Sequence, residues 1–189
     1  DALPIYEFRD IFKEKLDLHH IPALNNVLYN EYILFPIADF YLKKERWNEA
    51  IEVYEEMETI GALKGRGAEY YQKLGYALQK NKKYAEAIDA YLKADTLKPD
   101  NIWNNRHLAI CYRLNRNYQA ALSYYKKVEE ATPESTNVIF HIGSCLAELG
   151  QYEEAANYFF KLDFIESNCI KAWRGIGWCS FISQKHEQA

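Results

Sequence analysis

The residues best suited to chemistry in this sequence are two histidine–cysteine pairs. His107 precedes Cys111 by four residues, and His141 precedes Cys145 in the same way further along the chain. Imidazole and thiolate are preferred ligands of Zn²⁺, and four of them complete a tetrahedral site. If the two pairs lie on neighbouring parallel helices, equivalent positions are about 8–10 Å apart. The four side chains could then reach one ion only in a strained arrangement. We therefore predict no metal site and no cofactor.

The cysteines follow the same spacing. Cys111, Cys145 and Cys179 are equally spaced along the chain, and Ala77 holds the equivalent position one step earlier. A column shared by cysteine and alanine indicates a small buried side chain. Stacked helices place these positions farther apart than the ~7 Å that a disulfide spans between Cα atoms. Free thiols favour a reducing compartment such as the cytoplasm.

Catalytic patterns are missing from the sequence. The acidic pairs at 55–56, 129–130 and 153–154 are Glu-Glu pairs at helix surfaces, which indicates solvated faces rather than catalytic dyads. The sequence contains no Gly-rich phosphate loop, His-Glu-x2-His motif or nucleophile elbow. We predict that the protein is not an enzyme.

Composition sets further limits. The chain has 189 residues, is 49% hydrophobic, and carries a net charge of −4, so we expect no general attraction to nucleic acid. It contains no apolar run of about 18 residues, so we expect no membrane insertion. An excess of tyrosine, 16 residues, requires a structural explanation.

That explanation is an internal repeat with a period of about 34 residues. Apolar residues recur at spacings of three and four, as in amphipathic helices. Small residues recur where two helices would cross, and tyrosines recur around them. One unit reads Tyr71-x2-Leu74-Gly75-x2-Leu78, then Tyr84-x2-Ala87-x3-Tyr91, and ends near Pro99. Later copies carry Ala109, Gly143 and Gly177 in the column of Gly75, and Ala121 and Ala155 in the column of Ala87.

These columns resemble the tetratricopeptide repeat family, whose unit is a helix–turn–helix of about 34 residues. The resemblance covers 31–189 and implies an all-α fold, a right-handed solenoid of antiparallel helix pairs. It implies four full units and one partial unit, at 31–67, 68–101, 102–135, 136–169 and 170–189.

The two ends of the chain depart from the repeat. Within 1–30, Ile5, Phe8, Phe12 and Leu16 predict one amphipathic helix, which is a cap on the first unit, the end of a preceding domain, or an arm folded into the groove. The last unit stops after its first helix, at Ala189. Because a solenoid end needs a polar cap, we expect the natural protein to continue.

The resemblance also implies where a partner binds. In this family the first helix of each unit lines a concave groove that takes an extended peptide or a helix. A subgroup holds the carboxylate end of chaperones with basic and asparagine residues, but here only Arg106 and Lys171 match that pattern in charge. Basic residues outnumber acidic ones in the groove columns, beside aromatic residues, which is typical of interface hot spots. The predicted groove residues are Trp103, Arg106, Arg113, Phe140, Lys171, Arg174, Trp178 and Phe181.

The sequence thus predicts a non-catalytic protein–protein interaction scaffold whose partner carries acidic and apolar residues. Two alternatives remain open at this point. The repeats could be a regulatory or structural segment of a multidomain protein. They could also be an RNA-binding helical repeat, because Trp103 with Arg106, or Trp178 with Arg174, could stack bases. The acidic pI argues against RNA.

Overall fold

The computed structural model describes residues 34–60 and 65–187, and the helix predicted within 1–30 lies outside them. The described residues form helices and turns, without a strand among them. In chain order the helices are α3 (Phe35–Lys43), α4 (Trp47–Ile60), α5 (Gly67–Lys80), α6 (Tyr84–Leu97), α7 (Ile102–Leu114), α8 (Tyr118–Ala131), α9 (Thr136–Glu148), α10 (Tyr152–Ile165) and α11 (Ile170–Glu187). The chain divides into two compact units, one ending at Tyr70 and the other beginning at Tyr71.

The first unit is built around buried aromatic rings. The rings of Phe35 on α3 and Tyr54 on α4 meet edge to face, with centroids 6.5 Å apart. The Tyr70 hydroxyl donates a hydrogen bond of 2.6 Å to the carbonyl oxygen of Tyr54. The Arg66 guanidinium lies 4.1 Å from the centre of the Phe35 ring. Tyrosine therefore supplies this core with apolar area and also with a donor for a buried carbonyl.

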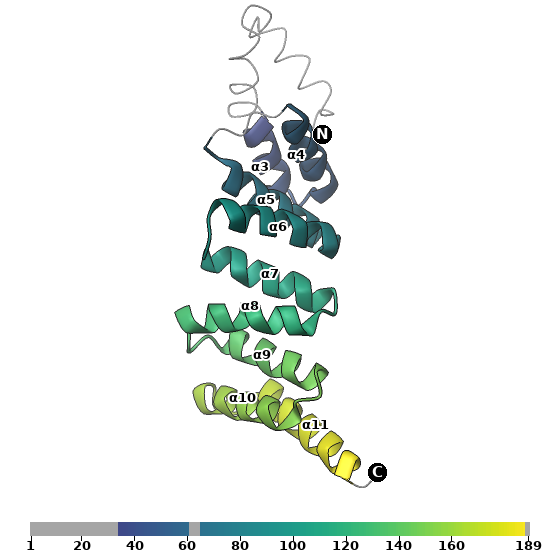
Figure 1. Cartoon of the computed structure of the whole chain (residues 1–189), viewed down its shortest axis with the longest axis vertical. Coiled ribbons are helices and arrows are strands. Elements are labelled where there is room, and N and C mark those ends of the chain that lie inside the picture. The colour runs from purple at the N-terminus through teal and green to yellow at the C-terminus, as the bar shows by residue number, and fades with distance from the viewer. Residues whose placement is uncertain (1–33, 61–64, 188–189) are drawn as a thin grey trace, which may run out of the picture. The chain divides into compact units, whose positions relative to one another are not determined.

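The second unit is a succession of helix pairs, which Figure 1 shows running from α7 to the yellow α11. α7 packs against α8, α9 against α10, and α10 against α11. Side-chain caps begin two of these helices. The Asn101 side chain accepts a hydrogen bond of 3.0 Å from the backbone N–H of Asn104, and the Asn117 side chain accepts one of 3.2 Å from Ala120. Such caps satisfy amides that the first turn leaves unpaired. The fold is an all-α helical-repeat solenoid, as the sequence predicts.

The small-residue column lets each helix pair approach closely. A Cβ atom added at Gly75 would lie 2.9 Å from the Tyr91 ring, and one added at Gly143 would lie 3.0 Å from the Phe159 ring. Both rings belong to the second helix of the same pair and are buried. At Gly75 and Gly143 a large ring of one helix thus lies against the bare backbone of the other, which explains glycine at these two positions.

The turn inside each pair also repeats. Lys82, Arg116 and Gly150 occupy equivalent positions in three successive pairs and all have positive φ, at 63°, 61° and 78°. This left-handed conformation ends the first helix of each pair, and glycine adopts it at the least cost. The backbone N–H of the following residue then bonds a carbonyl oxygen of the first helix, as in the 2.9 Å bond from Asn117 to Tyr112.

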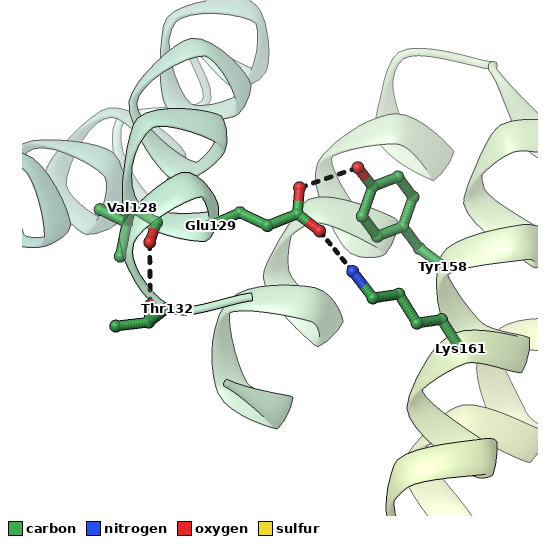
Figure 2. A network of polar contacts seen from close by, with 5 residues as sticks. All are labelled: Val128, Glu129, Thr132, Tyr158 and Lys161. Atoms are coloured by element: carbon green, nitrogen blue, oxygen red, sulfur yellow. Dashed lines mark hydrogen bonds and ion pairs between the residues drawn. The ribbon is translucent and has the colours of Figure 1, made fainter. Parts of the chain in front are cut away.

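One acidic residue joins two second helices. Glu129 on α8 accepts hydrogen bonds from the Tyr158 hydroxyl, at 3.0 Å, and from the Lys161 ammonium, at 2.7 Å, both on α10 (Figure 2). Its side chain is only 17% exposed. The prediction that Glu129 belongs to a solvated face is therefore wrong. Burial, together with the Glu129 contact, raises the pKa of Tyr158 to about 12.

Candidate functional site

The predicted groove residues come from the first helices of three successive pairs. Within the second unit, α7 carries Trp103, Arg106 and Arg113, and α9 carries Phe140. The remaining four lie on α11, and they are Lys171, Arg174, Trp178 and Phe181. Each of these positions either recurs at the same place in another repeat unit or lies one helical turn from a position that does. Helix periodicity therefore turns them toward a common side.

The structure brings four of the eight predicted residues together around one cavity. Phe140 on α9 and Lys171, Arg174 and Trp178 on α11 line a hollow of about 540 Å³. This volume lies in the range of pockets that hold small ligands or side chains. The remaining lining residues are Ser144, Ala147 and Glu148 from α9, Phe159 from α10 and Gly175 from α11.

The cavity combines aromatic surface with unneutralised charge. The Lys171 ammonium lies 5.8 Å from the centre of the Phe140 ring. Neither Lys171 nor Arg174 forms an ion pair with any residue in the described part of the chain. Glu148 is the single acidic residue in the lining. The cavity can therefore accept an anionic group beside an apolar one.

Trp103 and Arg106 lie elsewhere, on α7, and Trp103 belongs to an aromatic cluster. Trp103 is 43% exposed, and the centroid of its ring lies 4.0 Å from that of His107. His107 stacks on Tyr91, and its Nδ1 lies 2.7 Å from the Gln79 side-chain oxygen. The Tyr91 hydroxyl donates to the same oxygen at 3.1 Å. Burial, with the charges of Arg106 and Lys80, lowers the pKa of His107 to about 4.

His141 repeats this arrangement in the next pair. Its ring stacks on Tyr125 with centroids 5.4 Å apart. Burial, with the charges of Arg113 and Lys171, lowers its pKa to about 4. Arg113 is itself half-buried rather than exposed in the groove. Both imidazoles are thus neutral packing groups at pH 7, each covering a tyrosine ring.

The cysteine column lies in the core. Cys111, Cys145 and Cys179 are buried and unbonded, and burial raises the pKa of the Cys111 thiol to about 12. Within the described residues no three histidine, cysteine or acidic side chains cluster closely enough to hold a metal ion. Among the helices of those residues, none is both long and apolar enough to cross a bilayer.

Five lining residues are not among the eight predicted ones, and two of the five, Phe159 and Gly175, shape the cavity. Phe159 is a second-helix core residue, and its position in the repeat gives no indication that it reaches the groove. For Gly175, in contrast, the sequence does contain an indication. This glycine holds the position equivalent to His141 one unit later, in a column that holds histidine in the two preceding units. Phe181, by contrast, is 59% exposed and does not line the cavity.

Three family models match the sequence. Two are described as tetratricopeptide repeat and match residues 34–61 and 68–101. The third is described as anaphase-promoting complex, cyclosome, subunit 3, and matches residues 97–162. Together they extend over helices of both compact units. No protein of curated function matches the sequence significantly.

Solved structures with the same fold are numerous. MamA MSR-1 C2 has 25% sequence identity and a TM-score of 0.72, covering 85% of this chain and 91% of its own. MamA from Desulfovibrio magneticus RS-1, from residue 41 to its end, has 18% identity and a TM-score of 0.73, covering 83% and 87%. The first TPR of Spaghetti (RPAP3), bound to the HSP90 peptide SRMEEVD, has 23% identity and a TM-score of 0.56, covering 63% and 94%.

Proposed function

We propose that this chain, which belongs to the tetratricopeptide repeat family, is a non-catalytic scaffold that binds a partner segment along the first helices of its pairs. The fold is that of protein-interaction scaffolds, and one structural relative was solved with a peptide bound. The partner segment carries acidic and apolar residues. The observation that carries this proposal is the cavity between α9 and α11, where unpaired cations lie beside the half-buried Phe140 ring and the exposed Trp178 ring.

The chemistry of the groove supports the partner class. Arg106, Lys171 and Arg174 are exposed, and Trp103 and Trp178 present large apolar areas beside them. Exposed arginine and tryptophan dominate the energetics of protein interfaces. Exposed charges at such a site mainly set the association rate and its salt dependence, whereas buried rings set the dissociation rate.

The test is affinity capture with the intact protein, followed by identification of the partner and measurement of its Kd. Arg106→Glu combined with Arg174→Glu should weaken binding by about tenfold or more, which corresponds to about 1.4 kcal/mol or more. The melting temperature should stay nearly unchanged, because both side chains are exposed.

A matched control changes the same charge outside the groove. Lys98→Glu combined with Lys127→Glu alters the net charge by the same amount at two exposed positions. This variant, and the exposed Glu153→Gln, should bind as the native protein does. Loss of binding in the control with retention in the groove variant would refute groove binding. Glu129 is unsuitable as a control because it joins α8 to α10.

A further inference from the structure

We propose that the cavity between α9 and α11 is an anchor pocket, which receives an aromatic side chain of the partner that is adjacent in sequence to an acidic residue. The inference rests on the groove-binding function proposed above and adds which part of the groove selects the partner. Three observations carry it: a break in the histidine column, the packing of Phe159, and the unpaired cations.

The histidine column breaks at the last helix. In two successive pairs an imidazole covers the ring of the preceding second helix, since His107 stacks on Tyr91 at 5.7 Å and His141 on Tyr125 at 5.4 Å. The next equivalent position is Gly175, opposite Phe159. A groove side chain that fills space in the two earlier pairs is therefore missing here, and the cavity is lined by the glycine that replaces it.

Gly175 also fixes the position of the Phe159 ring. A Cβ atom at Gly175 would lie 2.6 Å from that ring, and one at Gly143 would lie 3.0 Å from it. The ring is thus held between the bare backbones of α9 and α11. Any side chain at position 175 would force this buried ring to move, so glycine is required both for the packing and for the open cavity.

The charges of the lining determine which side chains fit. Lys171 and Arg174 have no ion-pair partner among the described residues, and both lie within one helical turn on α11. A carboxylate matches the guanidinium in geometry and charge. Glu148, on the α9 wall, disfavours a second anion in the cavity. One carboxylate is therefore favoured at the α11 rim, with a neutral group deeper in.

The apolar lining favours an aromatic neutral group. Phe140 and Trp178 flank the cavity from the two helices, and Trp178 is 58% exposed. A ring inserted between them is flanked by aromatic surface on both sides, and aromatic pairs gain more than their buried area alone provides. The volume of about 540 Å³ accommodates a ring without repacking.

The experiment is an NMR titration of the isotopically labelled full chain with three peptides whose termini are blocked. The first is Gly-Ser-Glu-Phe-Ser-Gly. The second has Lys in place of Glu, and the third has Ala in place of Phe. The first peptide should shift the Trp178 indole and Gly175 amide resonances. It should bind at least five times more tightly than either of the others.

Variants of the pocket sharpen the test. Ser144→Trp places a large side chain on the α9 wall, at a half-buried position, and should reduce binding of the first peptide at least fivefold. Lys171→Glu combined with Arg174→Glu should reverse the preference, so that the Lys-Phe peptide binds more tightly. A gain of affinity cannot result from misfolding. Lys98→Glu combined with Lys127→Glu is the control matched in charge and should leave the preference unchanged.

The titrations can also overturn the proposed anchor pocket. Equal affinities for the three peptides, absence of any shift, or shifts confined to Trp103 and the rest of α7 would overturn the anchor pocket. None of these would refute the scaffold function, which fails only if the captured partner is insensitive to Arg106→Glu with Arg174→Glu. The two failures are therefore distinguishable.

Discussion

The neutral imidazoles of His107 and His141 tie the stability of the second unit to pH. Burial lowers both pKa values from 6.5 to about 4. The unfolded chain therefore binds protons more readily than the folded chain between those values, and the stabilisation present above pH 6.5 is lost as the pH falls toward 4. Both rings stack on buried tyrosines, so protonation opposes their packing.

We predict that the melting temperature falls between pH 7 and pH 5, and that His107→Gln with His141→Gln makes this fall shallower. The measurement is thermal unfolding by circular dichroism at several pH values, with the slope as the readout. The double variant itself unfolds at a lower temperature at pH 7, because it loses two ring contacts. An identical slope in both proteins would contradict the assignment of neutral, buried imidazoles.

Glycines in one column of the repeat should respond oppositely to alanine. At Gly75 the added Cβ would lie 2.9 Å from the buried Tyr91 ring, whereas at Gly177 nothing lies within 4 Å. Gly75→Ala should therefore destabilise the protein by about 1–3 kcal/mol through overpacking. Gly177→Ala should stabilise it by up to about 1 kcal/mol, because alanine is the better helix former. Chemical denaturation measures both changes, and effects of the same sign would show that the column is wrongly placed.

At the scale of the element, the two faces of α8 should differ strongly in how well they tolerate substitution. Ala121 is fully buried at a helix crossing, and Gln119 is exposed on the same helix. Ala121→Trp should cost about 1–3 kcal/mol or more by overpacking. Gln119→Ala should change stability by less than about 0.5 kcal/mol. Equal melting temperatures for the two variants would mean that the register of the repeat is wrong.

The helices themselves were predictable from sequence because their signals are local. Apolar spacing of three and four residues, the Ala87 and Gly75 columns, and Pro99 all act within one repeat unit. The contacts of Glu129 were not predictable in this way. Its partners lie 29 and 32 residues away on α10, and a surface carboxylate gives no indication in sequence of which cation or hydroxyl will reach it.

The candidate site was predictable in four of its lining residues but not in its shape. Repeat columns placed Phe140, Lys171, Arg174 and Trp178 on one side, and the structure brings them around one cavity. The cavity itself depends on how the Phe159 ring packs between two glycines, which no spacing rule describes. Arg113 shows the converse, since a residue in a groove column turns out to be half-buried.

At the scale of the whole molecule, helix content is the first test. The described helices account for well over half of the 189 residues. Far-ultraviolet circular dichroism should therefore show more than about half helix, against about 30–35% for a typical globular protein. A spectrum dominated by strand or irregular structure would contradict the fold.

The position of α11 has a consequence for how the site responds in time. Among the described helices α11 packs against α10 and α9, while Ile170 and Trp173 on it are 76% and 57% exposed. A helix that packs against neighbours on one side only unfolds locally more often. The backbone amides of α11 should therefore exchange with deuterium faster than those of α8 or α9. Because α11 carries both cations of the cavity, each opening event dismantles one wall of the site. The affinity for a partner then includes the free energy of keeping α11 folded against its neighbours. A bound peptide should therefore slow deuterium exchange along this helix, beyond the residues that the peptide touches.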